Sequence, residues 1–207
     1  MATLRTLSNF KSKLQGGGAR PNLFEVSIPN FPAAATGSSP AASFNNETFQ
    51  FLCKATNLPA SNTASIDVPF RGRIFKVAGD RTIDNWSVTV INDEDFVLRE
   101  AFEAWMNAIT KLDNNTGATN PGSYMTDAFV SQLGRGAGEG RFSKKNTSST
   151  SLTPLKTYKF VDIFPVNVSA IDLSYDSSDT IEEFTVEFAV QSFEAGDPKD
   201  QAGQRLK

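Results

Sequence analysis

The sequence predicts a mainly β protein: an antiparallel, sandwich-like or barrel-like subunit with one packing α-helix and long loop insertions. Three observations lead to this class. Apolar and polar residues alternate in several short segments, as in strands that bury one face. One stretch has instead the three- and four-residue spacing of a helix. Phenylalanine supplies 17 of the 207 residues and gives a core apolar area without polar groups that need partners.

Alternation predicts strands along the whole chain. In the first half, the alternating residues are Phe24, Val26 and Ile28, then Phe49, Phe51 and Cys53, and then Trp86, Val88 and Val90. A further stretch, 74–77, precedes a turn predicted at Gly79 and Asp80. In the second half, strands are predicted at Tyr158, Phe160 and 162–164, at Ile171, Leu173 and Tyr175, and at Phe184, Val186, Phe188 and Val190, with a short apolar island at Phe129, Val130 and Leu133 as a further candidate.

One helix is predicted to begin at Asn92 or Asp93 and to lie across the sheet. Its apolar positions are Leu98, Phe102, Trp105, Met106 and Ile109. The acidic trio at 93–95 suits a first helical turn, where carboxylates cap free N–H groups and complement the helix dipole. A metal site there would need further oxygen ligands, and no loop with that spacing precedes the helix.

The length favours one elaborated domain, 20–194, with insertions at about 33–43 and 113–151 and a C-terminal tail at 195–207. Residues 1–19 are interpreted as a docking segment, because Leu4, Leu7, Phe10 and Leu14 follow a helical spacing before a glycine run at 16–18. A flexible tail and a transit peptide are the alternatives. Within the second insertion, glycines from Gly134 to Gly140 precede basic residues. The stretch lacks the Gly-Lys-Ser/Thr ending of a phosphate-binding P-loop. Its composition is typical of a flexible linker.

Composition excludes most catalytic chemistry. The chain has no histidine and one cysteine, Cys53. We therefore expect no Ser-His or Cys-His catalytic pair, no intramolecular disulfide and no metal site built from several thiolates. We therefore assign no catalytic, cofactor-binding or metal-binding residues and expect no cofactor. The formal net charge of −3 argues against tight wrapping of nucleic acid. The sequence contains no apolar run of membrane-spanning length, and we expect a soluble chain without a membrane partner.

A set of sequence blocks points to a family. Arg-Pro-Asn-Leu-Phe stands at 20–24, Cys-Lys-Ala-Thr at 53–56 with Leu-Pro-Ala at 58–60, and Val-Ala-Gly-Asp-Arg-Thr at 77–82. Further blocks follow at 84–94, at 164–168 and at 181–186. In this order the blocks resemble the tail tube proteins of T4-like contractile-tailed bacteriophages, over roughly residues 20–194.

The resemblance implies a structural virion protein and not an enzyme. Subunits of this family would close into a hexameric ring, and rings would stack into a hollow tube that conducts the genome during ejection. The implied partners are other copies of the chain, the tail sheath protein, baseplate hub proteins, a tape measure protein and a tail terminator, with transient, non-specific passage of DNA. The implied location is the phage tail, assembled in the host cytoplasm.

Two functional surfaces are expected. The stretch from Thr56 to Arg81 is predicted to form a projecting hairpin arm that contacts an adjoining ring through Phe70, Arg71, Arg73 and Lys76. A simple solvated hairpin is the alternative. The polar side of the final predicted strand, Glu183, Thr185, Glu187 and Gln191, is a candidate lining of the lumen, because acidic groups repel phosphates at short range. The alternative places this side against the sheath.

Other functions stay open at this point. A tailocin or type VI secretion system would use a related tube. A monomeric β-sandwich binding module would recognise a sugar or protein with its loops. A carboxylate-based hydrolase would use acids such as Asp84, Asp93 or Glu187, but no pair among them is distinguished by the sequence.

Overall fold

The computed structural model describes residues 6–14, 18–32, 44–134 and 154–196. The chain divides into two compact units. One consists of residues 1–25, 129–159 and 194–207, and the other of residues 26–128 and 160–193. The boundary runs through strands, so long strands contribute to both units.

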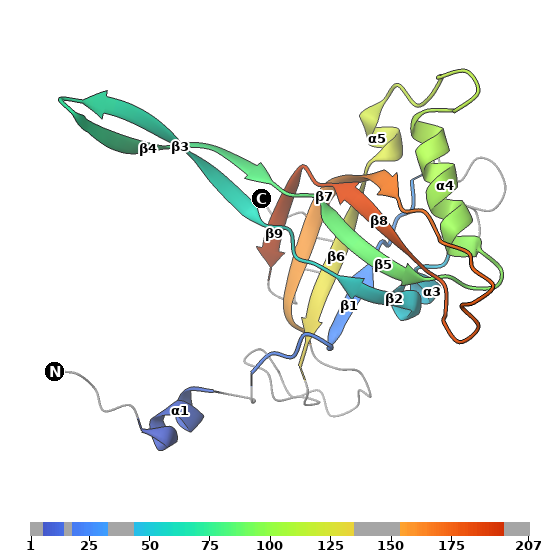
Figure 1. Cartoon of the computed structure of the whole chain (residues 1–207), viewed down its shortest axis with the longest axis horizontal. Coiled ribbons are helices and arrows are strands. Elements are labelled where there is room, and N and C mark those ends of the chain that lie inside the picture. The colour runs from blue at the N-terminus through green and yellow to red at the C-terminus, as the bar shows by residue number, and fades with distance from the viewer. Residues whose placement is uncertain (1–5, 15–17, 33–43, 135–153, 197–207) are drawn as a thin grey trace. The chain divides into compact units, whose positions relative to one another are not determined.

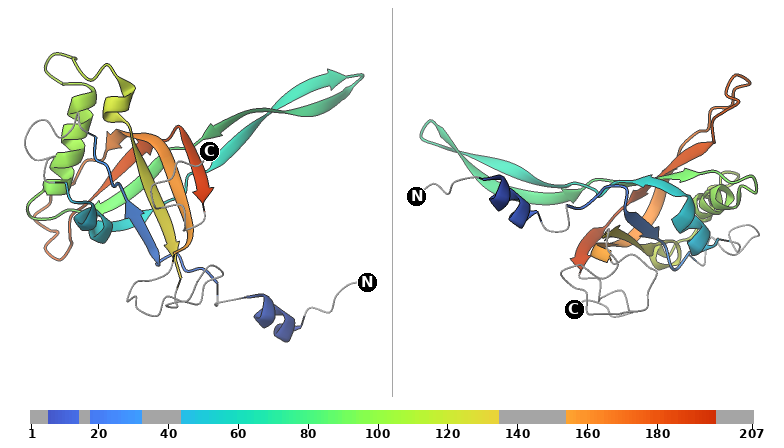
Figure 2. Two further views of the ribbon diagram at one scale, coloured as in Figure 1. Left: turned by 180° about the vertical axis from the view of Figure 1, so that it is seen from behind. Right: turned by 90° about the horizontal axis from the view of Figure 1, so that it is seen from below.

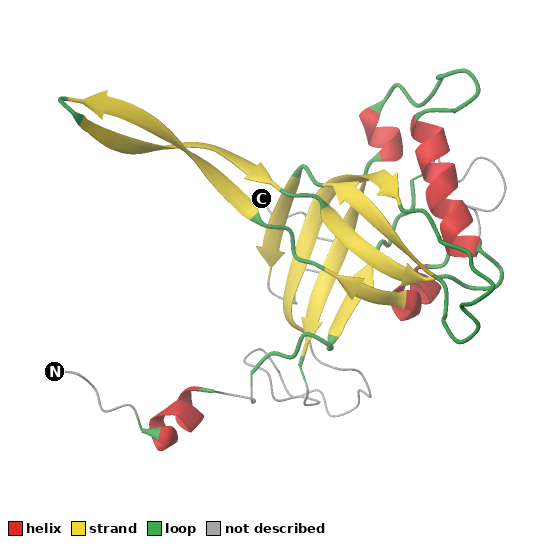
Figure 3. Ribbon diagram, in the orientation of Figure 1, coloured by secondary structure: helices red, strands yellow, loops and turns green. Residues whose placement is uncertain are grey.

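Strands dominate the described residues, and four helices interrupt them (Figures 1 and 3). The helices are α1 (Leu7–Lys13), α3 (Asn46–Leu52), α4 (Val97–Ile109) and α5 (Pro121–Tyr124). The strands are β1 (Phe24–Ser27), β2 (Cys53–Thr56), β3 (Ser61–Phe70), β4 (Arg73–Ile83), β5 (Trp86–Ile91), β6 (Thr126–Leu133), β7 (Pro154–Val168), β8 (Glu183–Ala189) and β9 (Ser192–Gly196). The mainly β prediction is confirmed, whereas the expectation of a single helix is wrong.

Seven strands form one sheet in the order β1-β6-β7-β8-β5-β2, with β9 paired to β7. The pairs β2–β5, β5–β8 and β7–β8 are antiparallel. Strands β3 and β4 form a separate antiparallel hairpin. It continues as a twisted two-stranded ribbon beyond the ends of β2 and β5 (Figure 2). The predicted island at 129–133 is confirmed as part of β6.

The core of the larger unit lies between α4 and the strands β5 and β8. Along β5 and β8 every second residue is buried, and on α4 the helical spacing buries Leu98, Ala101, Phe102 and Trp105. Trp86 stacks on Phe188 with ring centroids 5.0 Å apart, and its indole N–H donates to Thr56 Oγ1 at 2.8 Å. The alternation predicted for these two strands is therefore confirmed.

The strand predicted across Phe49, Phe51 and Cys53 is wrong, because residues 46–52 form α3. Asn45 caps this helix by accepting a hydrogen bond from the Glu47 N–H at 2.9 Å. Phe49 is buried, whereas Phe51 is 80% exposed, so the two rings do not share a face as strand alternation requires. A local cap and tertiary burial of one ring decide the helix. Strand β2 begins only at Cys53.

The turn predicted at Gly79 and Asp80 lies inside β4. Between the pairs Thr63–Arg81 and Ser65–Ala78, β4 has two residues, Gly79 and Asp80, where β3 has one, Ala64. This is a β-bulge, which glycine commonly occupies. The chain reverses instead at Arg71 and Gly72, with φ of 45° and 82°. Two successive positive φ values are the geometry of a tight hairpin turn.

Two other predictions need correction. Ile171, Leu173 and Tyr175 do not form a strand. Leu173 and Tyr175 are exposed, so these alternating apolar side chains do not pack against a core. Helix α4 begins at Val97 rather than at Asn92 or Asp93, and no side chain caps it. Asp93 instead closes a turn: its carboxylate accepts from the Glu94 N–H and its carbonyl from the Phe96 N–H.

Parts of the predicted insertions and termini lie outside the described residues, namely 33–43, 135–151 and most of 195–207. The described part of the second insertion is not a plain loop, since it contains α5 and β6. None of the described helices has the length and hydropathy needed to cross a bilayer.

Candidate assembly surfaces

The hairpin β3–β4 has two chemically different faces. Directly paired residues of antiparallel strands point to the same side, so the pairs Ile66–Val77, Val68–Phe75 and Phe70–Arg73 share one face. We call it the apolar hairpin face. Its five hydrophobic residues are between 42% and 66% exposed. Exposed apolar strips of this kind are typical of surfaces that bind other proteins.

The opposite face of the hairpin mixes polar and apolar residues. It contains the pairs Ser65–Ala78, Asp67–Lys76 and Pro69–Ile74. Lys76 Nζ lies 3.0 Å from Asp67 Oδ1 in an exposed ion pair. The sequence could not assign residues to the two faces, because only the observed register shows which residues of β3 and β4 share a side. Weak alternation of Ile66, Val68 and Phe70 was the available signal, and it did not show that Phe75 and Val77 share their side.

The predicted arm residues are distributed around the hairpin tip. Phe70 and Arg73 flank the turn on the apolar hairpin face, and Arg71 lies in the turn with its guanidinium carbon 5.5 Å from the centre of the Phe70 ring. Lys76 lies on the other face, where Asp67 partners it. The structure thus brings Phe70, Arg71 and Arg73 together and separates Lys76 from them.

The base of the hairpin is held by polar contacts. Asn62 donates to Asp84 Oδ1 at 3.0 Å, and the Asp84 N–H donates to the Ala60 carbonyl at 3.0 Å. The Arg81 guanidinium contacts Ser61 and lies 5.8 Å from the centre of the Phe193 ring in β9. Asp84, one of the acids considered for hydrolysis, therefore has a structural role at this joint.

The predicted lumen residues lie on the half-buried side of β8, apart from Gln191. Across the β5–β8 pair this side carries Ser87 opposite Glu187, Thr89 opposite Thr185 and Ile91 opposite Glu183. The Thr89 and Thr185 hydroxyls are 3.2 Å apart, and Glu183 forms an ion pair with Lys54. Gln191 follows the end of β8 and is exposed. We call this side the polar sheet face.

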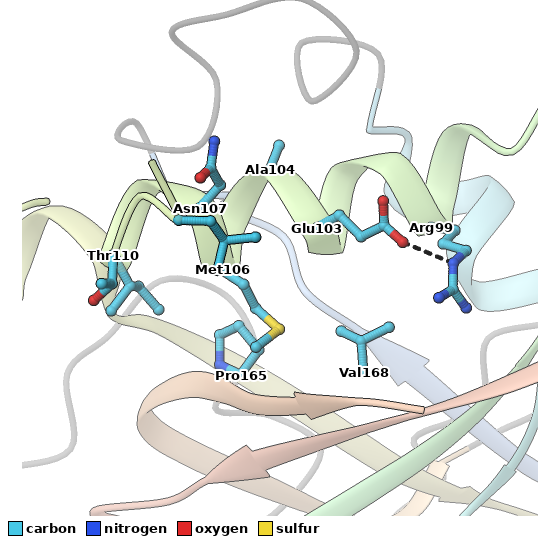
Figure 4. Close-up of a pocket in the computed structure, with 10 residues that line it drawn as sticks. Arg99, Glu103, Ala104, Met106, Asn107, Thr110, Pro165 and Val168 are labelled. Carbon is cyan, nitrogen blue, oxygen red and sulfur yellow. Dashed lines mark hydrogen bonds and ion pairs between the residues drawn. The ribbon is translucent and has the colours of Figure 1, made fainter. Parts of the chain in front are cut away.

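A third surface is a partly open groove of about 720 Å³ between α4 and the end of β7 (Figure 4). Met106 extends toward Pro165 across it. At one end Arg99 donates to Glu103 at 2.8 Å and to the Ser169 carbonyl at 3.2 Å. We call it the α4 groove. Its apolar lining consists of Ala104, Met106, Ile109, Leu112, Pro165 and Val168.

None of the described residues forms a grouping that suggests catalysis. Burial raises the pKa of the Cys53 thiol from 9.0 to about 12, which keeps it protonated and unreactive at neutral pH. Asp93 and Glu187, the other acids considered for hydrolysis, lie in the turn before α4 and in β8 respectively. Within the described ranges, no three Asp, Glu, Cys or His residues cluster as a metal site would require.

Comparison with solved structures identifies the fold. The chain superposes on the tube-terminating cap of the anti-feeding prophage with a TM-score of 0.55, at 14% identity, over 86% of this chain and 91% of that chain. A chain of the anti-feeding prophage baseplate gives a TM-score of 0.54 at 12% identity, over 86% and 95% of the two chains. The chain therefore belongs to the class of tube-like folds that these structures share.

Sequence relatives define the family within this class. The family model for phage tail tube proteins matches residues 19–195. The tail tube protein gp19 of Enterobacteria phage T4 is 34% identical over 179 residues, which covers 86% of this chain and 93% of the relative. A tail tube protein of Serratia phage KSP90 is 24% identical over 186 residues, covering 88% and 92%. The chain belongs to the phage tail tube protein family. It is a structural component of a contractile phage tail and of the virion, and not an enzyme.

Proposed function

We propose that the chain closes into hexameric rings that stack into the inner tube of the tail and form the conduit for genome ejection. The observation that carries this proposal is the apolar hairpin face, whose hydrophobic side chains have no partner surface within the described chain. Burying them against another subunit would gain roughly 25 cal/mol per Å² of apolar area. A monomer would leave this strip in water.

Open sheet edges support lateral ring contacts. Strands β1 and β2 stand at the two ends of the sheet order, and each therefore has an edge to offer a neighbour. Edge pairing between subunits removes an aggregation hazard, and a repeated head-to-tail contact closes into a ring when its rotation permits. Stable contacts of this kind bury on the order of 1,600 Å² in total.

The hairpin is proposed to link successive rings. Its length and its apolar face suit an arm that lies on a subunit of the adjoining ring, with Phe70 seated among apolar side chains. Arg71 and Arg73 near the tip would then meet acidic groups across the stack. Lys76 is assigned a smaller part, because Asp67 already partners its ammonium group.

Two neighbouring residues at the hairpin give a matched test of this arrangement. Phe75 lies on the apolar hairpin face and Ile74 on the opposite, mixed face, and they are 66% and 64% exposed. We expect Phe75→Asp to stay folded but to stop tube growth, whereas Ile74→Asp should form normal tubes. Negative-stain microscopy and sedimentation of the purified variants measure this. Equal assembly by both variants, or only monomer from the unmodified chain at high concentration, would contradict the proposal.

The remaining partners follow from the tube. A tube in a contractile tail needs a sheath around it, a baseplate hub at one end, a tape measure protein to set its length and a terminator at the other end. The structural neighbours include a tube-terminating cap and a baseplate chain, which supports this set. We place assembly in the host cytoplasm, before the tail joins the virion.

The polar sheet face is proposed to line the lumen. Hydroxyl groups and carboxylates dominate it, and a conduit lined in this way would offer DNA phosphates few attractive contacts. Because Glu183 is paired with Lys54, Glu187 is the stronger candidate for a charge that acts on passing DNA. Gln191 and Thr185 would contribute uncharged polar groups.

A further inference from the structure

Helix α1 is a short amphipathic helix whose apolar side chains are exposed. None of its seven residues is buried, and Leu7, Phe10 and Leu14 are 69%, 62% and 45% exposed. These three positions form one stripe, at i, i+3 and i+7. An isolated helix shorter than about 12–15 residues is marginal in water, so a seven-residue helix needs a surface that covers its stripe.

The α4 groove has the matching character. Its walls are mainly apolar, and α4 lines it along one side (Figure 4). An amphipathic helix that lays its apolar stripe into a hydrophobic groove is a recurrent recognition mode, with anchors at i, i+3 and i+7.

Charge complementarity identifies the two as partners. Residues 1–21 contain four basic residues and no acidic one. The segment 93–113, which contains α4, has six acidic and two basic residues. The connection 169–182, which begins next to Arg99 at Ser169, has four acidic residues and no basic one. A basic helix is therefore attracted to the surroundings of the α4 groove and steered toward it.

We propose that α1 of one subunit docks in the α4 groove of a second copy of the chain. This rests on the proposed function, because it requires subunits held side by side or in stacked rings. Leu7, Phe10 and Leu14 enter the groove, while Lys11 and Lys13 face the acidic segments around it. Nine residues, 15–23, separate Leu14 from β1. Fully extended they span up to about 30 Å, which is sufficient to reach a neighbouring subunit.

Docking of α1 would add a contact between subunits that the rest of the fold does not provide. We call this contact the strap. The family match covers residues 19–195 and so leaves α1 outside it. The strap would join subunits by an independent contact, in addition to edge pairing and the hairpin. Loss of α1 docking should therefore weaken the tube without changing the fold of the subunit.

Disulfide trapping between different chains tests this proposal directly. One chain carries Phe10→Cys and the other carries a cysteine in the groove, at Glu103, Met106 or Thr110. The two are mixed as monomers, assembled, imaged and oxidised. Three groove positions are used because a disulfide needs Cα atoms within about 7 Å. Native Cys53 does not compete, since burial raises its thiol pKa to about 12. Ser12→Cys, on the side of α1 away from the stripe, is the matched control.

We expect a linked dimer from Phe10→Cys with at least one groove position, several-fold above the yield from Ser12→Cys. Each chain has a single introduced cysteine, so a disulfide between the two introduced cysteines must join two different copies of the chain. Normal tubes that give no such dimer at any of the three positions would overturn the docking of α1 but leave the tube intact. Absence of tubes from the unmodified chain would instead overturn the proposed function.

A second measurement separates the groove from other docking places. We expect Phe10→Ser and Met106→Arg each to lower the yield of tubes roughly tenfold, and the double variant to lower it no further, because both remove the same contact. Circular dichroism of the monomers confirms that the fold is kept. If the two reductions in tube yield multiply in the double variant, the two residues act at different contacts and the proposal is wrong. This result is expected if the hairpin tip, and not α1, occupies the groove.

Discussion

At the scale of single residues, the surroundings decide what a phenylalanine does. Phe102 on α4 is fully buried and lies within 6.3 Å, centre to centre, of the rings of Phe49, Phe184 and Phe188. Phe51 on α3 is 80% exposed. The first ring joins helices α3 and α4 to strand β8, and the second contributes little to the fold of the subunit.

Replacing each of these rings by alanine should separate the two roles. We expect Phe102→Ala to lower the free energy of unfolding by about 3–5 kcal/mol, because it removes apolar contacts and leaves a cavity. Phe51→Ala should change it by less than about 0.5 kcal/mol. Denaturant unfolding of the monomer measures both values. Similar losses for the two variants would contradict the burial seen here.

The reactivity of Cys53 reports on the same core. Burial raises its pKa from 9.0 to about 12, so at mildly alkaline pH the folded chain should react with iodoacetamide roughly a thousandfold more slowly than the unfolded chain. The unfolded thiol ionises above pH 9 while the folded thiol keeps its proton. Raising the pH from 9 to 12 therefore favours unfolding, and Cys53→Ala should lose this part of the pH dependence. Rapid labelling of the folded chain would contradict the prediction.

At the scale of secondary structure, the end of α4 depends on a tight return of the chain. The Lys111 N–H donates to the Thr116 carbonyl at 2.8 Å, and the Ala118 N–H donates to the Ala108 carbonyl at 3.0 Å. Gly117 lies between these contacts. A Cβ on Gly117 would stand 1.9 Å from the Ile109 carbonyl oxygen, so only glycine allows the loop to approach the helix this closely.

Substituting this glycine tests the loop. Gly117→Ala should destabilise the subunit by about 1–3 kcal/mol, because backbone atoms must move apart to admit the methyl group. Gly122→Ala in α5 is the control. A Cβ there would meet its nearest neighbour, Asn120 Oδ1, at 3.6 Å, so its effect should stay within about 0.5 kcal/mol. Thermal unfolding followed by circular dichroism compares the two. Equal stability would show that the loop relaxes freely.

At the scale of the whole molecule, different surfaces of the subunit suit the assembly of the tube and the passage of DNA through it. The apolar hairpin face, the sheet edges and the α4 groove offer contacts to other proteins. The polar sheet face offers hydroxyl groups and carboxylates instead. A tube built from such subunits would hold itself together through apolar contacts while presenting its cargo with weakly binding groups.

Reversing one charge on the polar sheet face tests this division. Glu187→Lys places a cation on every subunit of each ring, and we expect normal tubes and sheath but slower release of DNA. The delay should shrink at high salt, where charges are screened within a few ångströms. Asp176→Lys, in the connection between β7 and β8, makes the same charge change on an exposed loop and should release DNA normally. Failure of Glu187→Lys to acquire a sheath, with normal release, would place this face on the outside.

Where local periodicity coincides with burial, the architecture was predictable from the sequence alone. Strands β5 and β8 were predictable because strict alternation leaves one choice of buried face, and Val88 and Val186 lie on that face. The apolar face of α4 was predictable because Leu98, Phe102 and Trp105 recur at helical spacing. The ordered blocks from 20 to 186 were specific enough to indicate the family that the comparisons confirmed.

Features that depend on residues distant in the sequence were decided by packing between elements. Residues 49–53 fit a strand or a helix by spacing alone, and burial of Phe49 with its ring near Phe102 decided for the helix. Gly79 suits a turn or a bulge, and pairing with Ala64 and its neighbours decided for the bulge. The apolar hairpin face and the α4 groove likewise bring together residues from separate elements. Such surfaces are determined by strand register and by packing between elements, and a local pattern contains neither.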